Sequence, residues 1–187
     1  MEEKKALRTR LRAMRKALSP QAQRLASRAV CERVLAFEAY KRAKVVMAYI
    51  ACRGELDVSP VMDDILSSGR TLLLPRCEEG GRLTARKIAS LAALSPGAYG
   101  VPEPGEESPV ALPETIDLIL VPGVAFDRDF YRLGQGGGYY DRFLKETHAV
   151  RAGVCHSAAL LDGVPREAHD MRMDAVITPK ALILREG

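Results

Sequence analysis

The chain has 187 residues, of which 47% are hydrophobic and 28% charged, and its net charge is +4 at pH 7. A chain of this length buries roughly 70% of its unfolded surface on folding, which is enough for one self-sufficient core. No apolar run approaches the roughly 20 residues that span a bilayer. The four cysteines form none of the close pairs that zinc ribbons and dithiol redox sites need. We therefore expect a single cytoplasmic domain over residues 1–187, with reduced cysteines and neither secretion nor membrane insertion.

Positive charge is concentrated at the N-terminus. Residues 1–16 contain seven basic and two acidic residues, so this segment carries more than the net charge of the whole chain. Its apolar residues recur at spacings of four, three and four, and they are Leu7, Leu11, Met14 and Leu18. This spacing predicts an amphipathic helix with these side chains inward. Charge alone leaves nucleic acid, an anionic membrane and a small polyanion open as partners.

A second helix is predicted from Ser19-Pro20 to about Phe37. The serine hydroxyl can accept a hydrogen bond from the first helical turn, and proline suits the first position because it lacks an N–H. Further along the chain, short apolar runs rich in β-branched residues predict buried strands. These runs cover residues 44–50, 71–74, 118–121, 152–155 and 175–177.

Helical stretches separate some of these strands, near residues 60–68 and 139–148. The alternation predicts an α/β fold, with an open, mainly parallel sheet and helices on both faces. Segment 78–113 interrupts this alternation with repeated glycines and prolines. We expect it to form a hairpin or an irregular excursion within the same domain.

The residues best suited to chemistry follow the predicted strand 118–121, because loops after the strands of an open α/β sheet usually form the ligand site. This loop contains Leu133-Gly134-Gln135-Gly136-Gly137-Gly138, here called the glycine loop. Its glycines leave space for a phosphate and tolerate positive φ, and the helix that follows offers unpaired amides. The loop lacks the Gly-Lys-Ser/Thr ending of a Walker loop and the spacing of a dinucleotide fingerprint. A merely flexible turn therefore stays open as an alternative.

Side chains around the glycine loop favour a nucleotide. Arg132 and Arg142 add positive charge, and Tyr139 and Tyr140 can flank a flat ring. Asp141 can hold Mg²⁺ against phosphates. Each has a plainer alternative, since the tyrosines can pack in the core and Asp141 can be a charge at the start of a helix.

Residues 132–142, together with Val121-Pro122-Gly123-Val124-Ala125-Phe126-Asp127, closely resemble the signature of the 5-formyltetrahydrofolate cyclo-ligase family, also called methenyltetrahydrofolate synthetases. The resemblance covers nearly the whole chain. Lys4-Lys5-Ala6-Leu7-Arg8 resembles the family's N-terminal motif, and Gly54-Glu55-Leu56-Asp57 falls at its folate-site glutamate. Residues 165–178 resemble its C-terminal block.

The resemblance implies an ATP-driven, Mg²⁺-dependent ring closure of 5-formyltetrahydrofolate to 5,10-methenyltetrahydrofolate, with release of ADP and phosphate. Phosphorylation of the formyl oxygen would turn a poor leaving group into a good one, and the neighbouring amine could then attack. Phosphoryl transfer depends on positioning and charge neutralisation more than on a protein nucleophile. The expected form is a monomer that binds this small molecule and has no nucleic-acid partner.

The resemblance also implies individual roles. The expected catalytic residues are Glu55, Arg132 and Tyr140. The residues expected to bind ATP are Lys4, Lys5, Arg8, Gly134, Gln135, Gly136, Gly137, Gly138, Tyr139, Asp141 and Arg142. Those expected to bind folate are Ile50, Glu55, Tyr139 and Tyr140, with the division of the tyrosines between folate and nucleotide left open. The expected metal ligands are Asp141 and Asp174, although Asp174 can also be an exposed residue at a strand end. The other basic residues of the first helix, expected to be solvated, are Arg10, Arg12, Arg15 and Lys16.

Some positions depart from the family pattern. Phe130-Tyr131 stands where many members have a glycine, and Cys155-His156-Ser157 replaces an expected aromatic residue and glutamine. These departures support a non-catalytic nucleotide- or folate-binding protein as the alternative, whereas the presence of Glu55 and Asp141 opposes it. RNA binding by the basic helix is disfavoured, because only 5% of the chain is aromatic and tryptophan is absent.

Two neighbouring pairs suggest acid–base chemistry but have simpler explanations. Cys155 and His156 are adjacent in a predicted strand, so their side chains should point to opposite faces. His169-Asp170 is expected to close a loop through hydrogen bonds to the backbone. We therefore expect neither pair to be catalytic.

Overall fold

The computed structural model describes residues 2–97, 100–167 and 170–186. The helices are α1 (Glu2–Lys16), α2 (Pro20–Ala36), α3 (Glu38–Arg42), α4 (Ser59–Ser67) and α5 (Tyr139–Phe143). The main-sheet strands are β1 (Val45–Met47), β2 (Thr71–Cys77), β3 (Leu83–Ile88), β6 (Val110–Ala111), β7 (Leu118–Pro122), β10 (Val150–Val154), β12 (Ala175–Ile177) and β13 (Leu182–Leu184). Smaller sheets contain β4 (Ser95–Pro96) with β5 (Pro102–Glu103), and β8 (Ala125–Asp127) with β9 (Arg132–Leu133) and β11 (Leu160–Leu161).

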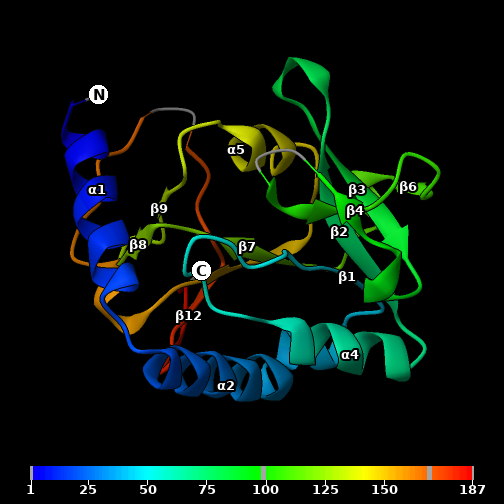
Figure 1. Ribbon diagram of the computed structural model, residues 1–187, viewed down its shortest axis with the longest axis horizontal. Coiled ribbons are helices and arrows are strands. Elements are labelled where there is room, and N and C mark those ends of the chain that lie inside the picture. Colours follow the sequence, from blue (N-terminus) through cyan, green and yellow to red (C-terminus); the bar gives the residue numbers. More distant parts are fainter. Residues whose placement is uncertain (1, 98–99, 168–169, 187) are drawn as a thin grey trace.

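The main sheet has the strand order β13-β12-β10-β7-β1-β2-β3-β6 among the described residues. The five central strands from β12 to β2 run parallel, while β13, β3 and β6 add antiparallel edges. Figure 1 shows α2 and α4 along one side of this sheet and α5 on the other, with α1 upright beside β8 and β9. The predicted α/β fold, with a mainly parallel sheet and helices on both faces, is confirmed.

Alternating side chains of the central strands build a core on each face of the sheet. Val46, Leu72 and Leu118 belong to the core under α2, α3 and α4. The next residue of each strand, such as Met47 or Leu73, belongs to the opposite core, which includes residues of α1 and α5. Burial on both faces explains why these strands are continuous apolar runs.

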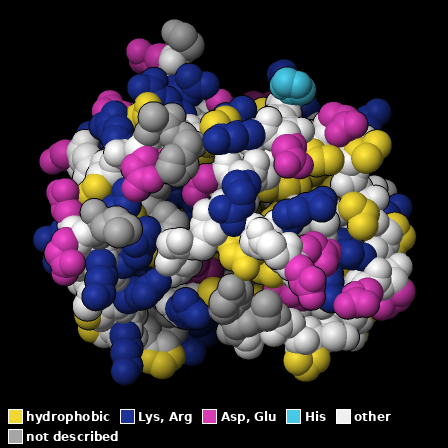
Figure 2. Space-filling view, turned by 90° about the horizontal axis from the view of Figure 1, so that it is seen from above, with side chains coloured by type: hydrophobic (Ala, Val, Ile, Leu, Met, Phe, Trp, Pro, Cys, Tyr) yellow, Lys and Arg dark blue, Asp and Glu magenta, His cyan; other side chains and the backbone are white. Residues whose placement is uncertain are grey.

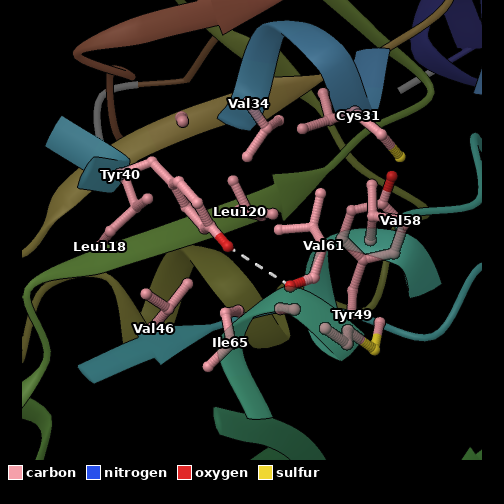
Figure 3. Packing of buried hydrophobic residues seen from close by; sticks show 14 of the residues in the cluster. Cys31, Val34, Tyr40, Val46, Tyr49, Val58, Val61, Ile65, Leu118 and Leu120 are labelled. Carbon is pink, nitrogen blue, oxygen red and sulfur yellow. Dashed lines mark hydrogen bonds between the residues drawn. The ribbon is translucent and has the colours of Figure 1, made fainter. Parts of the chain in front are cut away.

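Figure 3 shows the first of these cores, where Tyr40 reaches from α3 towards α4. Its hydroxyl donates to the backbone carbonyl of Val61 at 3.4 Å and lies 2.6 Å from the Asp64 carboxylate. The buried phenol therefore has polar partners. This contact ties α3 to α4 over the apolar side chains of β1 and β7.

The start and end of α2 agree with the prediction. Ser19 precedes the helix, and its hydroxyl accepts a hydrogen bond from the Ala22 amide at 3.2 Å. The helix ends at Ala36, one residue before the predicted Phe37. The predicted helix at 139–148 is wrong in length, because α5 ends at Phe143 and its chain continues as turns.

The predicted orientation of α1 is only half right. Leu11 is 3% exposed, but Met14 is 46% and Leu18 40% exposed. The buried residue in the last turn is Arg15, whose guanidinium donates to the carbonyls of Gly123 and Val124. The basic residues Lys4, Arg8, Arg12 and Arg15 recur at spacings of four, four and three, which also places them on one face of this helix. Carbonyl oxygens from the loop after β7 accept hydrogen bonds from Nη2 of the buried Arg15 guanidinium.

Part of segment 78–113 extends the main sheet. β3 pairs antiparallel with β2 from Leu83 to Ile88, and β6 pairs with β3. The remainder includes the two-stranded ribbon β4–β5. Within the described residues, no helix combines the length and the apolar character that crossing a membrane would require.

Candidate functional site

A pocket of about 890 Å³ lies beyond the carboxyl ends of β1 and β7. It is enclosed by α1, the loop after β1, the glycine loop and part of segment 78–113. The predicted site residues that line it are Lys4, Lys5, Arg8, Ile50, Glu55, Arg132, Gly134, Gln135, Gly136, Gly137, Gly138, Tyr139, Tyr140 and Asp141. The fold thus brings together residues that lie far apart in the sequence.

Backbone geometry explains the glycines of the glycine loop. Gly136 has φ +110° and Gly138 has φ +68°, values that side chains other than hydrogen rarely allow. Gly134 differs, since a β-carbon there would lie 2.6 Å from the Arg132 Nη1 atom and would displace the guanidinium. The loop can therefore approach both Arg132 and a ligand closely.

Arginines from α1 and β9 surround the glycine loop. Arg8 Nε donates to the carbonyl of Gly134 at 2.8 Å. Burial lowers the pKa of Arg8, and the neighbouring positive charges of Arg12 and Arg132 lower it further. Such repulsion between cations is relieved by an anionic ligand. Figure 2 shows Lys and Arg side chains gathered over the side of the molecule where α1 lies.

Arg132, Asp141 and Tyr140 form one contact group at the start of α5. Arg132 Nη2 lies 2.8 Å from Asp141 Oδ2, and its guanidinium lies 5.5 Å from the Tyr140 ring centroid. The Tyr140 hydroxyl is buried and has no hydrogen-bond partner among the described residues. Burial, and then the charge of Glu55, raise the pKa of Tyr140, so its hydroxyl stays protonated at neutral pH. It can donate a hydrogen bond to a ligand in the pocket.

Glu55 is held at the pocket by a tight turn after β1. Its amide donates to the carbonyl of Cys52 at 2.9 Å, and the central residues Arg53 and Gly54 have φ of 51° and 76°. Its Oε2 accepts from the Cys52 amide at 3.2 Å, and its Oε1 accepts from Gln135 Nε2 at 3.1 Å. The residue is 9% exposed, so its carboxylate has a defined orientation.

Lys4 enters the pocket from the start of α1 and contacts acidic residues from the loop before β12. Its Nζ lies 3.0 Å from Glu167 Oε1 and 3.3 Å from Asp170 Oδ2. Burial opposes protonation, but hydrogen bonds and charge attraction from these two carboxylates outweigh it and raise the pKa of Lys4. His169, which the sequence pairs with Asp170, lies outside the described residues.

Arg142 and Asp174 are the predicted site residues that do not line the pocket. Arg142 supports the glycine loop from outside, with Nη2 donating to the Gly137 carbonyl at 2.8 Å. Asp174 lies at the start of β12, where it accepts from the Arg151 amide at 3.0 Å and pairs with Arg185 at 2.8 Å. Of the two predicted metal ligands, the structure places only Asp141 in the pocket.

Several pocket residues were not predicted from the sequence. Asp170, Glu167 and Glu103 line the pocket, and Glu103 is 7% exposed. The solvated positions expected for Arg12 and Arg15 are wrong, because Arg12 is half-buried and donates to Gln135 while Arg15 is buried. The sequence did contain a signal for these contacts. Arg12 and Arg15 are spaced from Lys4 and Arg8 so that all four side chains lie on one face of the helix. Nothing in the sequence distinguishes Glu103 from the other acidic residues of its segment.

The thiols near the pocket are all free. Burial and the adjacent Glu55 raise the pKa of Cys52 to about 11, and burial and Glu103 do the same for Cys77. β10 ends at Val154, so the expected strand position of Cys155 and His156 is wrong. Instead, His156 Nε2 lies 3.0 Å from the carbonyl of Gly54 and helps to hold the turn that carries Glu55.

No group of three or more His, Cys, Asp or Glu side chains is arranged to hold a metal ion in the part of the chain that the structure describes. The pocket nevertheless combines clustered cations, a glycine loop and a few oriented carboxylates. These features define an α/β protein whose ligand site suits an anionic small molecule.

Comparisons with known proteins assign the chain to a particular family. The model of the "5-formyltetrahydrofolate cyclo-ligase family" matches residues 1–179. The solution structure of Aquifex aeolicus 5,10-methenyltetrahydrofolate synthetase is 37% identical, with a TM-score of 0.88 over 98% of this chain and 94% of that one. The 5-formyltetrahydrofolate cyclo-ligase of Escherichia coli (strain K12) is 29% identical over 175 residues, covering 90% of this chain and 96% of the relative. The Mycolicibacterium smegmatis enzyme of that name is 37% identical over 153 residues, covering 73% and 74%. The chain belongs to the 5-formyltetrahydrofolate cyclo-ligase family and is a ligase.

Proposed function

We propose that the protein uses ATP and Mg²⁺ to cyclise 5-formyltetrahydrofolate to 5,10-methenyltetrahydrofolate, with release of ADP and phosphate. The observation that carries this proposal is that one pocket contains both the glycine loop with its arginines and the oriented carboxylate of Glu55. We infer that the substrate is a folate from the names of the relatives. The free cysteines fit the cytoplasmic location that we propose for a monomeric enzyme.

The glycine loop and its arginines form the phosphate end of the pocket in this proposal. Arg8 and Arg132 face the loop with charges that the described contacts only partly neutralise, since Arg8 donates to a carbonyl and Arg132 pairs with Asp141. Charged hydrogen bonds to phosphate are roughly twice as strong as neutral ones. Lys4 and Lys5 would complete the clamp, which requires Lys4 to exchange its carboxylate partners for phosphate oxygens.

Glu55, Ile50 and the two tyrosines form the folate end. Glu55 can accept hydrogen bonds from the polar edge of the pterin because its carboxylate is held in place by Cys52 and Gln135. The protonated Tyr140 hydroxyl can donate to a folate oxygen or a phosphate. The half-buried side chain of Ile50 offers an apolar surface for the ring.

The donor set of the pocket fits Mg²⁺, which takes one or two carboxylates together with waters and substrate phosphates. We propose Asp141 as a ligand, and Asp170, which lines the same pocket, in the position that the sequence assigned to Asp174. When bound, the ion would neutralise charge on the phosphates. Arg132 would orient Asp141 through the contact already present.

The reaction balances without a protein nucleophile. The formyl oxygen attacks the γ-phosphorus and ADP leaves; the folate's second amine nitrogen then attacks the formyl carbon, losing its proton as phosphate departs. The protein's contribution is to align these groups, exclude water and stabilise charge, which phosphoryl transfer principally requires.

Ultraviolet absorbance of the methenyl product tests the proposal. Purified protein with 5-formyltetrahydrofolate, ATP and Mg²⁺ should give an increase that is lost when any one component is omitted. Glu55→Gln should reduce turnover while leaving ATP binding intact, because its carboxylate serves the folate end. Folded protein that binds ATP but yields no product would contradict the proposal and indicate a non-catalytic binding protein.

A further inference from the structure

A chain of hydrogen bonds connects α1 to Glu55 in the pocket wall. Arg12 Nη2 donates to Gln135 Oε1. Gln135 Nε2 then donates to Glu55 Oε1 at 3.1 Å, and the second carboxylate oxygen accepts from the Cys52 amide at 3.2 Å. Three segments that are distant in the sequence thus meet at one carboxylate.

The chemistry of the end groups sets the orientation of the Gln135 amide. A guanidinium can only donate, and an ionised carboxylate can only accept. The amide must therefore turn its oxygen to Arg12 and its nitrogen to Glu55, and the reversed amide would lose both hydrogen bonds. Arg12 thus fixes the orientation in which the Gln135 amide nitrogen donates to Glu55 Oε1.

Arg12 does not itself line the pocket, whereas Gln135 and Glu55 do. Its side chain is half-buried against the glycine loop, one helical turn beyond Arg8 on the same face of α1. The hydrogen-bonded route from Arg12 to Glu55 accordingly runs through Gln135.

We propose that Arg12 is a positioning residue for Glu55 and acts through the side-chain amide of Gln135. The inference deepens the proposed function and rests on it, because Glu55 is the group proposed to bind folate. Removing Arg12 frees the amide to rotate, and Glu55 then loses a fixed donor. Folate binding weakens although Arg12 does not touch the folate.

A double-mutant cycle tests this inference, with kcat and KM measured for both substrates. Arg12→Ala should lower kcat/KM for 5-formyltetrahydrofolate about three- to tenfold, the effect of one hydrogen bond. Arg12→Lys, which keeps a donor, should restore most of the loss. The exposed Arg10→Ala on the same helix should match the wild type. In the Glu55→Gln background, Arg12→Ala should have little further effect on the folate constant.

Three outcomes would overturn the inference: an undiminished Arg12 effect in the Glu55→Gln background, a change confined to the KM for ATP, or an equal loss in Arg10→Ala. An inactive wild type would instead contradict the proposed function. In that case NMR of the Gln135 side-chain amide tests the contact between Arg12 and Gln135 in the absence of folate. The amide resonances should shift in Arg12→Ala and stay in place in Arg10→Ala, and unchanged resonances in both variants would refute the relay.

Discussion

The arginines of α1 differ in what they contact although they share one helix. Arg10 is exposed, Arg8 reaches Gly134, Arg12 reaches Gln135, and Arg15 is buried under the loop after β7. Side chains three or four residues apart lie on one face, so position on the helix determines these differences. The charge of the N-terminal segment is therefore divided between the pocket, which Lys4, Lys5 and Arg8 line, and other parts of the surface and interior.

Arg8→Ala should weaken ATP binding by about 1.5–3 kcal/mol, the usual loss for a hydrogen bond to a charged group. Isothermal titration calorimetry with ATP and Mg²⁺ measures this difference directly. Arg10→Ala removes the same charge from an exposed position and serves as the matched control. Similar losses in both variants would mean that net charge, and not the contact at the glycine loop, governs binding.

His156 should make stability depend on pH. Burial lowers its pKa below the usual 6.5, a hydrogen bond to Gly54 opposes this effect, and Arg15 adds to it. Since the unfolded chain takes up the proton at the higher pH, the stability is complete above about pH 6.5 and is lost as the pH falls towards the folded-state pKa. Urea unfolding at pH 7.5 and 5.5 should show a smaller decrease for His156→Gln than for the wild type. His148→Gln, at an exposed position, should keep the wild-type decrease.

At the residue scale, the sequence predicted the pocket where short motifs impose local geometry or charge. The glycine loop, Arg132, Glu55 and Arg8 all line the pocket as expected. Asp170 lines the pocket whereas Asp174, the predicted metal ligand, does not, because the path of the chain before β12 decides which carboxylate faces the pocket. Such a path depends on tertiary contacts that periodicity does not encode.

Helix α1 is joined to the body of the protein by a buried cation. Arg15 is 6% exposed and donates to the carbonyls of Gly123 and Val124. The apolar residues that this helix contributes to the core are the buried Leu11 and the partly buried Leu7. The docking of α1 consequently depends on Arg15 as well as on hydrophobic packing.

Arg15→Ala should lower the free energy of unfolding by about 2–3 kcal/mol, because two buried carbonyls lose a charged donor. Urea denaturation measures the change. Lys16→Ala, the exposed neighbour, should stay within about 0.5 kcal/mol of the wild type. A loss under 1 kcal/mol for Arg15→Ala would indicate that water replaces the guanidinium without cost.

Among the elements, buried strands and capped helices were the most predictable. β1 and α2 follow from a β-branched run and from Ser19-Pro20, signals that are local. Phe130 shows the opposite case, since it has φ +68° in the turn between β8 and β9. This conformation favours glycine, and the pairing of β8 with β9 maintains it despite the side chain.

At the scale of the whole molecule, the pocket joins both ends of the chain to the middle of the sheet. Lys4 comes from α1, Glu55 from the loop after β1, and Asp170 from the loop before β12. A ligand that contacts all three regions binds only the folded protein. Its binding energy is thus added to the stability of the fold.

ATP with Mg²⁺ should therefore stabilise the protein against urea. At a free concentration 100 times its Kd, the free energy of unfolding should rise by about 2.7 kcal/mol. Arg8→Ala should show a smaller rise at the same ATP concentration, in proportion to its weaker binding. An unchanged midpoint for the wild type under saturating ATP would rule out binding selective for the folded state.

The contacts of α1 also have a consequence for the order of folding. Arg15 and Gly123 are separated by 108 residues, and Arg8 and Gly134 by 126, so docking α1 closes very long loops. Closing such loops costs conformational entropy, and the contacts of α1 compensate this cost only after the loop after β7 and the glycine loop have folded. We expect α1 to dock after the transition state, so Arg15→Ala should accelerate unfolding and leave the refolding rate nearly unchanged in stopped-flow measurements. Helix α1 is then among the last elements to reach its place, and the pocket is completed at the end of folding.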